Sequence, residues 1–385
     1  MTKKKLYFII ICSLIISTFS LYITSNTKSK QLYYIFFRKI TITNESIDPL
    51  YLSENYTTFS LLMNSSWQMT KLLNASSIFK LETDEDSNLN IIFSTDSVQP
   101  GENISVSYSL QIEQRKRLRP TISISKSGQL SDIPFTIQER YCQQSETFSI
   151  KDVEIERLAF RVWNKTGMSE NVLEIVCELA NWIGINVKSK TMDVARYPSE
   201  TLKSRLGDCD DKANLLITMC RILGIPSFLQ VGCIYGSSRI ETAWENHLTS
   251  IYNSVSFHAW AIIYIPPWGW LPFDMTLGWN KDNCINGITS APVYSTDTFQ
   301  LLNITSIDWV GDSRRFKQQV IDSPLYFQDE VTIIHTSTTD HLQDMKSLIE
   351  RIIGVNFTQI MRKKELNQYF IKLLNSATVS NNFNI

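Results

Sequence analysis

Three side chains that can act together as a nucleophile, its base and the acceptor that orients the base lie at the ends of predicted helices and strands. Cys209 lies at the start of a helix, predicted from the apolar residues that recur every three or four positions between residues 210 and 223. His258 begins a run rich in aromatic and β-branched residues, and Asp274 ends the next such run. A thiol needs a base to take its proton, and the base needs an acceptor on its other ring nitrogen. The pattern predicts a helix that begins at the thiol and two strand-like runs that carry the imidazole and the carboxylate.

The spacing of His258 and Asp274 fits the two arms of a β-hairpin. The stretch Pro266-Pro267-Trp268-Gly269 between them is typical of a turn. A turn centred near Pro266 places His258 opposite Asp274, and cross-strand neighbours lie about 5 Å apart at Cβ. A bulge would shift this register by one residue. Asp274 has a second interpretation, as a turn residue that caps the following segment.

The helix start affects the acidity of Cys209 in two opposite ways. Unpaired N–H groups and the positive end of the helix dipole favour the thiolate. The carboxylates of Asp208, Asp210 and Asp211 disfavour it, because nearby negative charge opposes a second anion. We expect an imidazolium at His258 to supply much of the activation, so that the pKa of Cys209 is lowered.

The order and content of these motifs resemble the transglutaminase-like superfamily. The motifs that carry the resemblance are Gly207-Asp208-Cys209, Arg221-Ile222-Leu223-Gly224-Ile225-Pro226, His258-Ala259-Trp260 and Asp274-Met275-Thr276. The resemblance covers roughly residues 155 to 300 and implies a papain-related α+β core, in which the helix that carries Cys209 packs on an antiparallel sheet. It also implies that Cys209 is the nucleophile, His258 the general base and acid, and Asp274 the residue that orients His258. Members of the superfamily include acyl transferases, cysteine proteases, peptide N-glycanases and proteins without activity.

The motifs and the resemblance together predict a thiol enzyme that cleaves peptide or side-chain amide bonds through a thioester acyl-enzyme. We favour hydrolysis, by a protease or amidase, over transfer to an amine by a transglutaminase, because no acceptor-amine site is recognisable. The alternative is a non-catalytic module for adhesion or assembly at the cell surface. The expected partner is a protein or peptide substrate, with no cofactor and no metal. Nucleic acid is not expected, since the net charge is −1 and no basic surface is evident.

Other residues have weaker signals for a role in this site. The oxyanion hole would use the Cys209 backbone N–H and a second donor, for which Tyr197 and Trp182 are the candidates. Trp260 and Trp270 are candidates for the substrate groove, although aromatic residues in strands are also typical of a core. The remaining cysteines at apolar positions are interpreted as packing residues: Cys177, Cys220 and Cys233. Only Cys142 and Cys284 lie in loop-like surroundings where they could pair.

The N-terminus predicts a membrane anchor. Three lysines, Lys3 to Lys5, precede the uncharged stretch Leu6 to Ile23, whose length suits a transmembrane helix. The charge bias places the lysines in the cytoplasm and the rest of the chain in an extracytoplasmic space. A cleaved signal peptide, with Thr18-Phe19-Ser20 as a weak cleavage site, is the alternative and would give a secreted protein.

Four regions follow from these patterns. Residues 1–24 form the lysine cluster and the anchor, and residues 25–150 a β-rich extracytoplasmic region. Within the latter, strands are predicted at residues 104–112, 121–125 and 134–137, as a small antiparallel β-domain. Residues 151–305 form the transglutaminase-like catalytic domain. Residues 306–385 form a helical C-terminal region, with helices predicted at residues 342–352 and 360–374.

Overall fold

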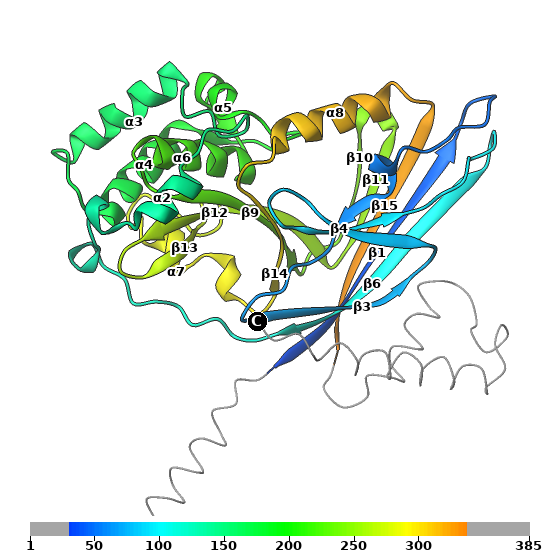
Figure 1. Ribbon diagram of the computed structural model, residues 1–385, viewed down its shortest axis with the longest axis horizontal. Coiled ribbons are helices and arrows are strands. Elements are labelled where there is room, and N and C mark those ends of the chain that lie inside the picture. The colour runs from blue at the N-terminus through cyan, green and yellow to red at the C-terminus, as the bar shows by residue number, and fades with distance from the viewer. Residues whose placement is uncertain (1–30, 337–385) are drawn as a thin grey trace, which may run out of the picture. The chain divides into compact units, whose positions relative to one another are not determined.

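A four-stranded antiparallel sheet, ordered β13-β12-β9-β14, carries two of the three predicted site residues at its strands or their ends. The computed structural model describes residues 31–336 (Figure 1). The strands are β9 (Ser227–Tyr235), β12 (Val255–Ile265), β13 (Gly269–Phe273) and β14 (Thr298–Ile304).

Four helices pack beside this sheet. They are α3 (Val153–Lys165), α4 (Val172–Asn186), α5 (Pro198–Ser204) and α6 (Cys209–Ile222). Helix α6 contacts β9 and β12 on one side and α3, α4 and α5 on the other (Figure 1). Because α6 is covered on both sides, all its residues from Asp211 to Arg221 are buried. The predicted arrangement of a cysteine-bearing helix on an antiparallel sheet is therefore present.

Strands β9 and β12 continue beyond this sheet into a second one. After β9 the chain passes Gly236 into β10 (Arg239–Ala243), which pairs with β11 (Leu248–Asn253). Ser254 alone joins β11 to β12, and its positive φ of 56° bends the strand between the two sheets. The register also slips here by one residue, as at a β-bulge, because Tyr235 pairs with Val255 but Arg239 pairs with Tyr252.

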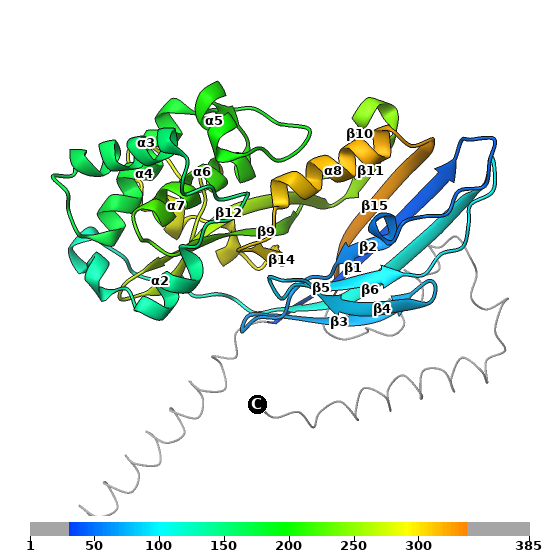
Figure 2. The ribbon, with the colours of Figure 1, turned by 45° about the horizontal axis from the view of Figure 1, so that its top comes forward.

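The second sheet has six strands, in the order β10-β11-β15-β1-β6-β3 (Figure 2). The four strands not yet named are β1 (Leu32–Asn44), β3 (Gln68–Ala75), β6 (Asn103–Gln114) and β15 (Leu325–Thr336). Its members therefore come from the predicted N-terminal, catalytic and C-terminal regions alike. A smaller sheet contains β2 (Thr58–Ser60), β5 (Leu89–Phe93) and β4 (Phe79–Thr83), and a short parallel pair contains β7 (Lys188–Ser189) and β8 (Leu206–Gly207).

Local sequence patterns gave mixed results outside the catalytic region. The alternating stretch 104–112 is a strand, as predicted, within β6. The strands predicted at 121–125 and 134–137 are wrong: residues 124–126 form a 3₁₀ turn, and α2 (Phe135–Tyr141) begins directly after Pro134. Phe135 is 71% exposed, so apolar character at this position did not signal a buried sheet face.

The region after residue 305 also differs from its prediction. It starts with a helix, α8 (Trp309–Ile321), but then returns to the six-stranded sheet as β15. The alternation of buried side chains in β15 was hidden in the sequence, because the buried position 329 is an aspartate. The helices predicted at residues 342–352 and 360–374 lie outside the described residues.

The predicted single-pass membrane topology is corrected. Between residues 31 and 336, no helix is long and apolar enough to cross a membrane. The segment Leu6 to Ile23, on which that prediction depended, lies outside the described residues. The described residues therefore form a mixed α+β fold that includes no membrane-spanning helix, and the membrane localisation derived from that helix is withdrawn.

Candidate functional site

His258 and Asp274 form a direct side-chain contact. His258 Nε2 lies 2.5 Å from Asp274 Oδ2, and the side chains of both residues are almost completely buried. They are not opposite each other in the sheet, because Ala261 pairs with Phe273 and continuation of that register would bring Trp260 opposite Asp274. Instead the chain leaves β13 after Phe273, and the Asp274 carboxylate reaches back to the imidazole.

Asp274 also organises the turn that follows it. Its Oδ1 accepts hydrogen bonds from the backbone N–H groups of Thr276 (2.8 Å) and Leu277 (2.6 Å). The two interpretations of this residue are therefore compatible, since one oxygen caps the turn while the other contacts His258. Burial would raise the pKa of Asp274, but His258 and these two N–H groups outweigh burial, so the pKa lies below its usual value.

Cys209 is the first residue of α6, as predicted, and its thiol faces β12. The backbone N–H of Ala259 is one of two N–H groups that stabilise the Cys209 thiolate, which places the sulfur beside the residue that follows His258. Because His258 Nε2 contacts Asp274, Nδ1 is the ring nitrogen that does not take part in this contact. The three predicted residues thus gather at one place, between the N-terminus of α6 and strand β12.

The expected lowering of the Cys209 pKa is wrong. Burial raises the pKa of this thiol to about 12, and the negative charges of Asp210 and Asp208 act in the same direction. The N–H groups of Ala259 and Asp210 lower the pKa, but by less. The resting residue is therefore a neutral thiol, and local desolvation outweighs the helix-start effect on which the expectation depended.

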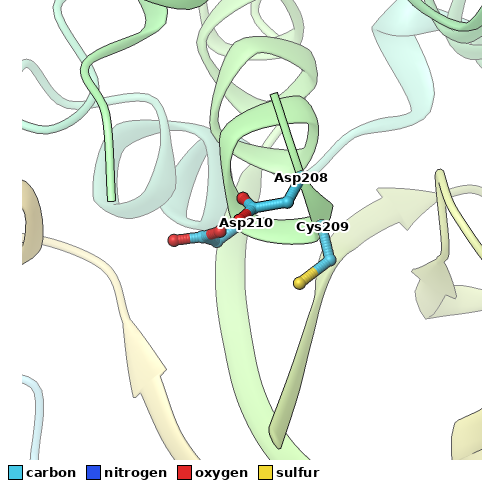
Figure 3. Close-up of side chains that lie close together, drawn as sticks. All are labelled: Asp208, Cys209 and Asp210. Carbon is cyan, nitrogen blue, oxygen red and sulfur yellow. The ribbon is translucent and has the colours of Figure 1, made fainter. Parts of the chain in front are cut away.

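Two carboxylates lie next to this thiol (Figure 3). The ligand atoms of Asp208, Cys209 and Asp210 are all within 4.8 Å of one another. Burial and a hydrogen bond with Asp208 raise the pKa of Asp210 well above its usual value. A thiol and two carboxylates are possible metal ligands, but three consecutive residues at a helix start do not by themselves make a metal site.

The two candidates for the second oxyanion donor are engaged elsewhere. The Tyr197 hydroxyl donates to the Asp308 carboxylate at 3.2 Å, beside the start of α8. Trp182, on α4, lies against the guanidinium of Arg205, which is 4.5 Å from the centre of its ring. Neither contact is with Cys209 or His258.

The two tryptophans predicted to line a groove belong to packed aromatic clusters. Trp260 is 1% exposed, so it cannot line a groove open to solvent. Trp270 is half-buried and makes edge contacts with Tyr141 and Phe228. Sequence reasoning overlooked Gln230, which accepts a hydrogen bond from the Trp260 indole N–H at 3.1 Å. A lone glutamine in a strand gave no signal of this contact.

The described cysteines are all free thiols, including Cys142 and Cys284. Cys284 does not pair with Cys142 but lies beside Cys177, to whose carbonyl oxygen its sulfur is 3.6 Å away. Cys177, Cys220 and Cys233 are buried, in agreement with their interpretation as packing residues.

Comparison with known proteins identifies the central part of the chain. The family model described as the transglutaminase-like superfamily matches residues 157–275, a range that contains Cys209, His258 and Asp274. A curated relative, the uncharacterized protein YebA of Bacillus subtilis, is 23% identical over 189 residues, which make up 46% of this chain. The chain spans only 24% of the length of that relative.

The solved structures that match this chain are distant from it in sequence. A candidate cysteine protease from Cytophaga hutchinsonii is 17% identical, with a TM-score of 0.49, over 80% of this chain and 92% of that one. Red sea bream transglutaminase is 10% identical, with a TM-score of 0.29, over 69% of this chain and 51% of that one. At the level of the superfamily, the family match supports a cysteine-based enzyme. Residues 157–275 of this chain are a domain of the transglutaminase-like superfamily, with a mixed α+β fold.

Proposed function

We propose that this protein is a cysteine-nucleophile enzyme that hydrolyses amide bonds in protein or peptide substrates. The observation that carries the proposal is the 2.5 Å contact between His258 Nε2 and Asp274 Oδ2 on the strand that faces the Cys209 thiol. A carboxylate on Nε2 selects the tautomer with its proton there, so that Nδ1 can accept a proton. Those are the requirements of a base that activates a thiol.

In the proposed reaction, His258 Nδ1 takes the proton of Cys209 as the sulfur attacks the substrate carbonyl carbon. The C–N bond then breaks, and His258 returns the proton to the leaving amine, which gives a thioester on Cys209. Water, deprotonated by His258, attacks the thioester and releases the acid and the thiol. The neutral resting thiol favours proton transfer during attack over a preformed ion pair.

Transfer of the acyl group to an amine shares the thioester and differs only in the second nucleophile. Hydrolysis remains the favoured outcome, because water reaches any site that is accessible to the substrate and no acceptor-amine site has been recognised in the sequence. A non-catalytic role would leave the contact between His258 and Asp274 without a chemical purpose.

The test is a search for products that depend on Cys209. Wild-type protein and the Cys209→Ala variant are incubated with a broad peptide library, with and without a labelled primary amine, and the products are identified by mass spectrometry. Shortened peptides or released ammonia in the wild type alone would support hydrolysis. Amine incorporation would support transfer, and Cys220→Ala, which alters a buried packing cysteine, serves as the control. The absence of any Cys209-dependent product, with Cys209→Ala still folded, would contradict the proposal.

A further inference from the structure

Trp260 lies against the imidazole of His258 on the same face of β12. The ring centroids are 5.8 Å apart, with 40° between the ring planes. The hydrogen bond to Asp274 holds one end of the imidazole, and contact with a large rigid ring restricts its rotation. The position of the indole therefore influences the direction in which His258 Nδ1 points.

The indole is itself held closely by its surroundings. Gly232, which pairs with His258 across β9 and β12, leaves the space that the indole occupies. A Cβ at position 232 would lie 2.7 Å from Trp260 Cη2 and 2.2 Å from the carbonyl oxygen of Phe299. Only glycine therefore fits beneath this ring, and the ring has little freedom to tilt toward the sheet.

Gln230 holds the polar edge of the indole and connects it to β14. Its Oε1 accepts from Trp260 Nε1 at 3.1 Å and from Gln300 Nε2 at 2.8 Å. Its Nε2 donates to Asn303 Oδ1 at 2.8 Å. Gln230 and Gln300 are 5% and 3% exposed, so these bonds form in a dry environment where an unpaired amide would be costly. Two residues of β14, Gln300 and Asn303, thus hold the amide that contacts Trp260.

The chain of amides continues into the six-stranded sheet. Gln68, at the start of β3, accepts from the backbone N–H of Gln300 at 2.8 Å and donates to its carbonyl oxygen at 2.8 Å. Gln114, at the end of β6, donates to Gln68 Oε1 at 3.2 Å and to the carbonyl oxygen of Thr298 at 2.8 Å. Both residues lie outside residues 157–275, so a segment beyond the superfamily domain is connected to the site.

We propose that Gln230 and Trp260 are positioning residues for His258, and that Gln300, Gln68 and Gln114 hold this pair in place from β14 and the six-stranded sheet. The inference deepens the proposed function and rests on it for its catalytic meaning. Neither Trp260 nor Gln230 transfers a proton in the proposed reaction. Their effect is on the orientation of the imidazole, and an error of about 1 Å in such an orientation is enough to slow a reaction severely.

The experiment compares four variants by two readouts. Gln230→Leu removes the acceptor, Trp260→Phe removes the indole N–H, and Gln230→Glu keeps an acceptor for both donors. Gln138→Leu, which breaks a side-chain bond to the Gly224 carbonyl, is the matched control. The first readout is the imidazole N–H signal of His258 in nuclear magnetic resonance spectra across pH, assigned by its loss in His258→Ala. The second is kcat and KM for a peptide substrate.

We expect Gln230→Leu and Trp260→Phe to shift the His258 signal. Both should lower kcat roughly tenfold with little change in KM, because acid–base catalysis contributes about 10²- to 10⁴-fold in all. Gln230→Glu should restore both readouts toward wild type, and Gln138→Leu should leave them unchanged. If Gln230→Leu does not fold, Trp260→Phe and Gln230→Glu still decide the matter.

Different results would contradict the positioning role of Gln230 and Trp260 and the proposed function. An unaltered His258 signal in folded Gln230→Leu or Trp260→Phe would overturn the positioning role, whether or not turnover is found. An absence of turnover in the wild type would overturn the proposed function, while the spectra would still show whether Gln230 and Trp260 fix the imidazole.

Discussion

Two buried side-chain pairs, one in each large sheet, differ in the distance along the chain that separates their members. His258 and Asp274, at the four-stranded sheet, are 16 residues apart and meet across one hairpin. Arg38 on β1 and Asp329 on β15, in the six-stranded sheet, are 291 residues apart and form two hydrogen bonds of 2.9 and 2.7 Å. The first pair is built by local structure, whereas the second exists only after both ends of the described chain have come together.

The two pairs are expected to serve different purposes, one in a reaction and the other in folding. The His258–Asp274 pair is expected to matter for the rate of a reaction, because it leaves a ring nitrogen available. The Arg38–Asp329 pair satisfies both partners and is covered, with side chains 20% and 12% exposed, so it is expected to matter for folding alone. Three sets of substitutions test this distinction.

The largest effect is expected from Asp274→Asn. The asparagine keeps an oxygen for the N–H groups of Thr276 and Leu277 but loses the acceptor for His258 Nε2–H. Turnover should fall by about 10⁴-fold, as expected when the orienting carboxylate of a triad is lost, while the thermal unfolding temperature stays close to wild type. Steady-state kinetics would measure the turnover, and calorimetry would measure the unfolding temperature. Asp274→Ala, which also loses the turn cap, should be less stable, and turnover of Asp274→Asn within tenfold of wild type would contradict the orienting role.

A smaller but still large effect is expected from Arg38→Met, and it should appear in stability. This change leaves the Asp329 carboxylate buried without a partner, which costs about 3–5 kcal/mol of unfolding free energy. Urea denaturation followed by tryptophan fluorescence would measure it. The double variant Arg38→Met/Asp329→Leu removes both charges and should recover most of the loss. A double variant as unstable as the single one would show that packing, and not the unpaired charge, is responsible.

The smallest effect concerns the acidity of the thiol. With the pKa of Cys209 raised to about 12, its alkylation by iodoacetamide should be slow at pH 7 and increase about tenfold per pH unit above it. Asp208→Asn/Asp210→Asn removes two negative charges that raise this pKa, so the pKa should fall and alkylation should be faster at each pH. Mass spectrometry of the modified cysteines gives the rates.

Cys142 provides an internal control for this measurement. Burial raises its pKa to about 12 as well, but Arg221 and not the aspartate pair lies near it, so its rate should not change in the double variant. A wild-type alkylation rate at Cys209 that reaches a plateau near pH 7 would instead show a preformed thiolate and contradict the neutral resting thiol.

Local sequence patterns were sufficient to predict the elements that depend on neighbouring residues in the chain. The start of α6 at Cys209, strand β12 and the hairpin to β13 follow from apolar periodicity, aromatic and β-branched content and a proline-rich turn. The sequence also limited His258 and Asp274 to opposite arms of that hairpin. The registry was missed by two positions, because the side chain of Asp274 crosses the gap after the strand has ended.

The surroundings of these elements depend on contacts between segments that are distant in the sequence. The pKa of Cys209 depends on how deeply β12 covers the sulfur, and periodicity along α6 contains no measure of that desolvation. The sequence was compatible with Trp260 as a groove residue, whereas in the structure Gln230 and Gly232 enclose its indole. The six-stranded sheet joins β1 to β15 from opposite ends of the described chain, and a strand carries no local signal that names its partner. Pairing is settled by burial on both faces and by contacts such as Arg38 with Asp329, which form only when distant segments meet.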